Sequence, residues 1–121
     1  MLDVCAQQLL TSYGMRSLAP THEDYEGIFT GDRYARDGAY HQGTVWSWLI
    51  GPFVEAHYHV YHDRETALSY LRPFAQHLND LCLGNIGEVF YGDAPHLPRG
   101  CAAQAWSVAE VLRMWMKLTR G

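Results

Sequence analysis

The stretch that decides the fold is residues 36–53, RDGAYHQGTVWSWLIGPF. Up to Gly43 it is polar and turn-forming, whereas from Thr44 onward it is apolar with the three-to-four-residue repeat of a helix. Asp37, His41 and Gln42 therefore stand just before a predicted buried helix. Polar groups held on a loop by a rigid element suggest a functional site at the rim of a scaffold.

Apolar periodicity predicts helices over residues 2–13, 44–61, 65–83 and 102–118, with Asp63 as the N-cap of the third. Pro52 and Pro73 fall inside the second and third helices, so each predicts a bend. Segments 15–43 and 85–100 have no periodicity, and we interpret them as long functional loops. Because no alternating strand pattern occurs, the expected fold class is all-α.

The composition fits one small domain or a piece of a larger one, with 121 residues of which 48% are hydrophobic. A net charge of −4 without a basic cluster argues against a nucleic-acid partner. No apolar run approaches the ~20 residues that span a membrane, and the first residues lack the basic segment of a signal peptide. The three cysteines have no CxxC spacing and are interpreted as reduced, buried thiols of a cytoplasmic protein.

Two carboxylates are candidates for chemistry. Glu88 lies between apolar residues in a glycine-rich loop, where it can act as a general base on water; the alternative is an ordinary surface glutamate. Asp37 can bind a substrate hydroxyl or cap its own loop, and the capping interpretation is slightly favoured. The same alternatives apply to Asp32, Asp93 and Arg99.

Side chains suited to sugar recognition flank the start of the second predicted helix. His41 and Gln42 offer directional hydrogen bonds of the kind that bind sugar hydroxyls, or they cap the helix. Trp46 can stack on the face of a sugar ring. The other three tryptophans fit core stripes better: Trp48, Trp106 and Trp115.

His57, His59 and His62 suggest a metal site at first sight. On a helix, however, His57 points away from His59, and the spacing to Glu65 does not fit a cupin-type metal motif. Motifs for nucleotide binding and for a nucleophilic serine are also lacking. We therefore expect no metal and no cofactor.

Three blocks of sequence resemble the C-terminal glucosidase domain of glycogen debranching enzymes, the amylo-α-1,6-glucosidase family. The first is GMRSLAP at residues 14–20, and the second is RDGAYHQGTVW at 36–46 followed by WLIGPF at 48–53. The third consists of EVF, GDAPH, PRGC and AQAWSVAE between residues 88 and 110. The blocks follow one another in the family's order over nearly the whole chain, and YHQGTVW is far more specific than any single motif.

This resemblance implies that residues 1–121 form a single partial domain. Its expected architecture is an arc of αα-hairpins from the C-terminal part of an (α/α)6 toroid. The implied activity is inverting hydrolysis of α-1,6-linked glucose at the branch points of glycogen or a related branched α-glucan. Glu88 matches the family's general base. The segment that lines the glucose pocket is matched by Asp37, His41, Gln42 and Trp46.

The chain also departs from the family pattern. Ser47 replaces a usual proline, and Gly87 replaces a small polar residue, which is expected to loosen the loop that carries Glu88. An inverting enzyme also needs a general acid. In the family this acid lies in an upstream segment with a Trp-Met-Asp signature, and that signature does not occur here. We therefore expect the isolated chain to be weakly active or inactive, with exposed apolar flanks that favour self-association or docking to an upstream half-domain. A non-catalytic α-glucan-binding remnant and a structural fragment without a ligand are the alternatives.

Overall fold

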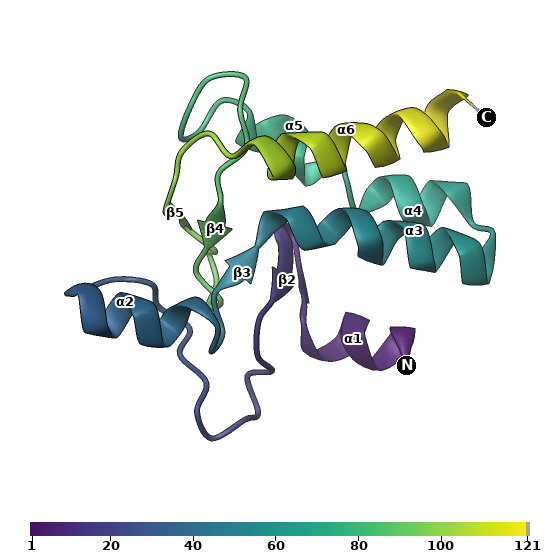
Figure 1. Ribbon diagram of the computed structural model, residues 1–121. Helices are drawn as coiled ribbons and strands as arrows, with labels where there is room; N and C mark the ends of the chain where they lie inside the picture. Colours follow the sequence, from purple (N-terminus) through teal and green to yellow (C-terminus); the bar gives the residue numbers. More distant parts are fainter. Residues whose placement is uncertain (121) are drawn as a thin grey trace.

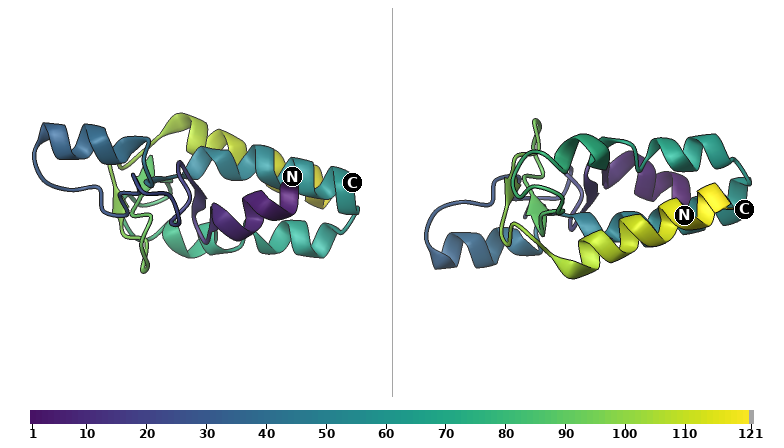
Figure 2. Two further views of the ribbon diagram at one scale, coloured as in Figure 1. Left: turned by 90° about the horizontal axis from the view of Figure 1, so that it is seen from below. Right: turned by 90° about the horizontal axis from the view of Figure 1, so that it is seen from above.

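Helices and a small sheet make up the fold that the computed structural model describes for residues 1–120. Helices α3 to α6 lie together, whereas α2 projects at the end of the molecule opposite to both termini (Figure 1; Figure 2). The helices are α1 (Leu2–Gln8), α2 (Arg33–Tyr40), a 3-10 helix η1 (Ser47–Leu49), α3 (Ile50–Tyr61), α4 (Arg64–Ser69), α5 (Pro73–His77) and α6 (Ala105–Arg120). The strands are β1 (Leu10–Thr11), β2 (Gly14–Arg16), β3 (Val45–Trp46), β4 (Val89–Phe90) and β5 (Pro98–Arg99).

The prediction of an all-α arc of helical hairpins is wrong, because the five strands form one antiparallel sheet in the order β1-β2-β3-β4-β5. Each strand has only two or three residues. Alternation between two faces needs about four residues to become visible in a sequence, so strands this short leave no periodic signal. The predicted loops are in fact joined to each other by this sheet.

Helix α2 was also missed, since it lies within the segment predicted to be a loop. Asp32 begins it as an N-cap, accepting a hydrogen bond from the backbone N–H of Ala35 (2.9 Å). Ala39 is its one buried residue. A helix that buries so little has no apolar stripe, and the glycine in its interior, Gly38, is a residue typical of loops.

The other helices are shorter than predicted. The first ends at Gln8, and the chain then turns into the β1–β2 hairpin, in which Thr11 pairs with Gly14. Pro73 does interrupt the third predicted helix: it becomes the first residue of α5, where its missing N–H costs nothing. Pro52 lies in the first turn of α3, where its missing N–H likewise costs no helical hydrogen bond. The kink expected at Pro52 is therefore replaced by the 3-10 turn that precedes the helix.

The apolar core lies between α3, α4, α5 and α6, and α3 is flanked by α6 on one side and α1 on the other (Figure 1). Ile50, Phe74 and Met114 are almost completely buried there. Burial of such side chains stabilises the fold by roughly 1.5–3 kcal/mol each. The outer face of α6 is different, since Trp106 and Trp115 are 46% and 41% exposed.

The exposure of the tryptophans differs from the sequence interpretation. Trp46, which was proposed to stack on a sugar ring, is only 8% exposed, whereas Trp106 and Trp115, which fitted core stripes better, are partly exposed. The cysteines are free as predicted, but they are not buried: Cys5 and Cys82 are half-buried and Cys101 is exposed. In residues 1–120, no helix has the length and apolar character required to cross a bilayer.

Candidate functional site

The pairing of β3, β4 and β5 determines where Glu88 lies. Trp46 is opposite Val89, and Val89 is opposite Arg99, so the chain around Gly100 runs beside the residue that precedes β4. The backbone N–H of Glu88 donates to Cys101 O (2.9 Å), and the N–H of Cys101 donates to Glu88 Oε2 (3.0 Å). Gly100 has a φ of +70°, and a Cβ there would lie 2.5 Å from Glu88 Oε2. Glycine at this position therefore leaves room for the carboxylate.

The hydroxyl of Tyr40 donates to the other carboxylate oxygen of Glu88, Oε1. Burial and this hydrogen bond to Glu88 both raise the pKa of Tyr40. The phenol therefore stays protonated at neutral pH and acts as a donor. Glu88 itself is half-buried rather than desolvated, so it is in contact with both the protein and solvent.

Trp46 supports this arrangement from behind. Its indole Nε1 donates to Tyr40 O (2.8 Å), and its ring lies 4.4 Å from the Tyr40 ring between centroids. The imidazole of His41 stacks on the indole at 5.5 Å with an interplanar angle of 7°. The exposed face of this stack is therefore His41, with Trp46 covered beneath it.

Two open cavities flank Tyr40. The larger, about 640 Å³, lies between α2, the loop before it and β5, and Asp37, Tyr40 and Gly100 are among its lining residues. The smaller, about 240 Å³, is lined by His41 and by three tryptophans: Trp46, Trp48 and Trp106. Glu88 does not line either cavity itself; it contacts two of the residues that form the wall of the larger one, Tyr40 and Gly100.

The remaining predicted residues separate into two groups. Asp37 lines the larger cavity, but its carboxylate also lies 3.6 Å from Arg33 Nε on the same exposed helical face. Gln42 is exposed in the turn after α2, where its backbone N–H donates to Ala39 O (3.1 Å), and it lines neither cavity. The structure therefore brings Glu88, His41 and Trp46 together around Tyr40, places Asp37 with Tyr40 on the wall of the larger cavity, and leaves Gln42 apart.

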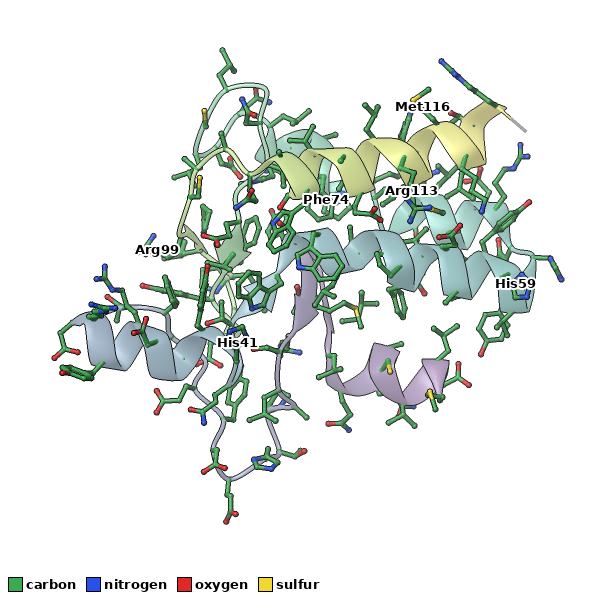
Figure 3. All side chains as sticks on the ribbon, in the orientation of Figure 1. His41, His59, Phe74, Arg99, Arg113 and Met116 are labelled. Atoms are coloured by element: carbon green, nitrogen blue, oxygen red, sulfur yellow. The ribbon has the colours of Figure 1, made fainter. Side chains whose placement is uncertain are left out.

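The less favoured candidates have structural contacts. Asp93 accepts a hydrogen bond from the hydroxyl of Tyr25 (2.9 Å). Arg99 places its guanidinium 4.8 Å from the centroid of the Tyr91 ring and also lines the larger cavity. Figure 3 shows Arg99 and His41 at the sheet end of the molecule, far from His59.

The histidines of α3 do not form a metal site. His57 is buried against aromatic rings, 5.2 Å from that of Tyr70, whereas His59 and His62 are exposed. Within residues 1–120, no group of three His, Cys, Asp or Glu side chains could hold a metal ion.

Sequence reasoning missed Tyr40 and Gly100 as partners of Glu88. Tyr40 is adjacent to His41, but nothing in the sequence indicates that it contacts a carboxylate 48 positions later. The loosening expected from Gly87 is not observed either. This residue is buried, and its N–H and C=O are both hydrogen-bonded, to His77 Nε2 (3.0 Å) and Ser47 Oγ (2.6 Å).

These contacts suit a carboxylate that accepts protons. Both partners of Glu88 donate to it, one to each oxygen, and each carboxylate oxygen has a second lone pair available for a water molecule. A partly solvated carboxylate that is fixed at two points and can still accept a hydrogen bond from water has the contacts required of a general base.

A comparison with protein-family models gives the context for this geometry. The model described as amylo-alpha-1,6-glucosidase matches residues 1–113, which include every residue of the site. The match covers most of the chain, so this chain belongs to the amylo-alpha-1,6-glucosidase family, a family of glycoside-hydrolase-type domains.

Proposed function

We propose that this chain contributes the general base and part of the sugar-binding surface of a glucosidase that removes α-1,6-linked glucose from branched α-glucans such as glycogen. The observation that carries the proposal is the fixation of Glu88. Tyr40 and the backbone of Cys101 hold its two oxygens, and Tyr40 also forms part of the wall of the larger cavity. In an inverting mechanism the base removes a proton from the attacking water while a separate acid protonates the leaving oxygen.

The binding roles follow from where the other side chains lie. The exposed imidazole of His41, stacked on Trp46, presents a flat surface with polar edges that suits a glucose ring. Asp37 lines the larger cavity and would accept hydrogen bonds from sugar hydroxyls there. Gln42 would reach the sugar only if the turn after α2 moved toward the cavity.

The general acid is proposed to come from a polypeptide segment outside these 121 residues. An inverting pair of carboxyl groups is separated by roughly 6.5–9.5 Å, with one group protonated. Asp37 is the one carboxylate among the residues that line the larger cavity, but it lies on an exposed helical face, 3.6 Å from Arg33 Nε, and is not in contact with Glu88.

The test is glucose release from a branched limit dextrin. The chain is assayed alone and after mixing with a segment that carries the missing acid, if one is encoded nearby. Activity only in the mixture, lost in Glu88→Gln and kept in the exposed-loop control Glu23→Gln, is the expected result. Activity that persists in Glu88→Gln would refute the role of Glu88.

A second candidate function is α-glucan binding without cleavage. It is favoured by the smaller cavity, whose lining of three tryptophans suits the apolar faces of sugar rings. Titration with maltooligosaccharides, followed by tryptophan fluorescence, would show saturable binding that Glu88→Gln leaves unchanged. Inactivity of every mixture together with such binding would favour this function over catalysis.

A further inference from the structure

The two peptide groups on either side of Gly87, the residue before Glu88, are each held by a buried side chain. The N–H of Gly87 donates to Nε2 of His77 (3.0 Å), which belongs to α5 and is 1% exposed. The C=O of Gly87 accepts from Oγ of Ser47 (2.6 Å), which begins η1 and is completely buried. The N–H belongs to the Ile86–Gly87 peptide and the C=O to the Gly87–Glu88 peptide, so two elements far apart in the sequence fix the peptide planes on both sides of Gly87.

The hydroxyl of Ser47 is itself oriented by a third element. Its Oγ lies 2.6 Å from Oγ of Ser107 on α6, which is also completely buried. Ser47 has one hydroxyl hydrogen, and the carbonyl of Gly87 can only accept it, so Ser107 must be the donor to Ser47. The backbone N–H of Ser47 also donates to Glu88 O (3.3 Å).

The orientation of the Gly87–Glu88 peptide determines where the Glu88 side chain points. Rotation of the Gly87–Glu88 peptide would swing the carboxylate away from the Tyr40 hydroxyl and the Cys101 N–H. Ser47 binds the C=O of that peptide, and His77 binds the N–H of the peptide before it. Buried N–H and C=O groups that lose their partners are costly, so the two bonds together restrict rotation about both backbone bonds of Gly87.

We propose that His77 and Ser47 are positioning residues for Glu88, acting through the two peptide groups that flank Gly87 and without touching the substrate. The proposal rests on the proposed role of Glu88 as the base. A displacement of about 1 Å at a reacting group can reduce turnover by about 100-fold, so such residues matter although they lie behind the site.

His77 can do this only while its Nε2 is unprotonated. The hydrogen is then on Nδ1, which lies 3.4 Å from Asp80 Oδ2 but is too poorly aligned for a hydrogen bond. The rings of Tyr13 (5.7 Å) and Phe90 (4.8 Å) pack against the imidazole from the other elements, so Asp80 and Tyr13 are the titratable groups that face it. Burial lowers the pKa of His77, and Asp80 partly opposes this. Protonation would set an N–H against the N–H of Gly87 and break the bond.

The experiment compares His77→Gln with His77→Leu. Glutamine places an acceptor oxygen near the position of Nε2 but does not titrate, whereas leucine keeps the apolar volume and removes the acceptor. In the active mixture, His77→Leu should lower kcat by about 10- to 100-fold with little change in KM. His77→Gln should restore most of that kcat and shift the acid limb of the pH profile to lower pH. Equal kcat in the two variants would overturn the proposal.

A second readout does not depend on catalysis. In the chain alone, the amide resonance of Gly87 should titrate together with the imidazole of His77 and become independent of pH in His77→Gln. The pKa of Tyr40, followed by NMR of its ring, should fall in His77→Leu and in Ser47→Ala because Glu88 no longer faces it. Ser107→Ala removes an equally buried hydroxyl but leaves Gly87 bonded, so its effect should be smaller.

These readouts separate the two proposals. A Gly87 amide that ignores the titration of His77, or an unchanged pKa of Tyr40 in both His77→Leu and Ser47→Ala, would overturn the positioning role even in an active enzyme. Both shifts in a protein without any hydrolytic activity would support the positioning role and count against the proposed function alone.

Discussion

Replacing Tyr40 by phenylalanine removes one hydroxyl group and tests the central contact of the site. The ring would keep its packing against Phe29 (5.3 Å) and Trp46 (4.4 Å). What is lost is the hydrogen bond to Glu88 Oε1. Hydrogen bonds to charged groups contribute about 1.5–3 kcal/mol. Because both partners are half-buried and water can replace the hydroxyl, we expect a loss at or below the lower end, about 1 kcal/mol.

The assay is urea unfolding followed by tryptophan fluorescence. With a slope of about 1–3 kcal/mol per molar urea, a loss of 1 kcal/mol lowers the midpoint by roughly 0.3–1 M. Tyr34→Phe is the matched control, since Tyr34 is on the same helix and is 88% exposed. It should leave the midpoint unchanged.

A double-mutant cycle isolates the pairwise contribution. Combining Tyr40→Phe with Glu88→Ala should destabilise the chain by about 1 kcal/mol less than the sum of the single changes, because the bond can be lost only once. A coupling energy below about 0.3 kcal/mol would refute the conclusion that this hydrogen bond holds the carboxylate.

Two further outcomes concern stability. Gly14→Ala should destabilise the chain by about 2 kcal/mol or more in thermal unfolding, because φ is +136° and a Cβ would lie 2.8 Å from the Ser47 Cα. Gly38→Ala, inside α2 with open space around the position, should instead stabilise it by about 0.5–1 kcal/mol; equal effects of the two would contradict this distinction. The lowered pKa of His77 means that the unfolded chain binds a proton more readily, so stability should be full above pH 6.5 and decrease as pH falls below it. His77→Gln should remove that part of the pH dependence, and an unchanged pH–stability curve would contradict it.

The sequence predicted helices wherever they bury an apolar stripe. The cores of α3 and α6 lie inside their predicted ranges, and Asp63 caps α4 by accepting from Thr66 N (3.0 Å). These predictions succeeded because periodicity and capping are local properties of a chain. Helix α2 escaped notice because its surroundings supply almost no burial, and burial is what produces a stripe.

The candidate site was predictable only as a list of residues. Glu88, Asp37, His41 and Trp46 were identified, chiefly through the resemblance, but their roles relative to one another were not. Trp46 is buried under His41, a contact that the sequence did not indicate. Which of two adjacent aromatic side chains is covered depends on contacts from distant segments, and one sequence does not contain that information.

The small sheet explains why these residues meet at all. β3 follows the segment with Tyr40 and His41, and β4 follows Glu88 directly. The pairs Val45–Phe90 and Trp46–Val89 therefore bring the two loops together. β5 adds the chain on the other side of Glu88, and with it the Cys101 N–H. Each strand contributes few hydrogen bonds, but together they convert two glycine-rich loops into a fixed rim. The element absent from the predicted fold is thus the one that assembles the candidate site.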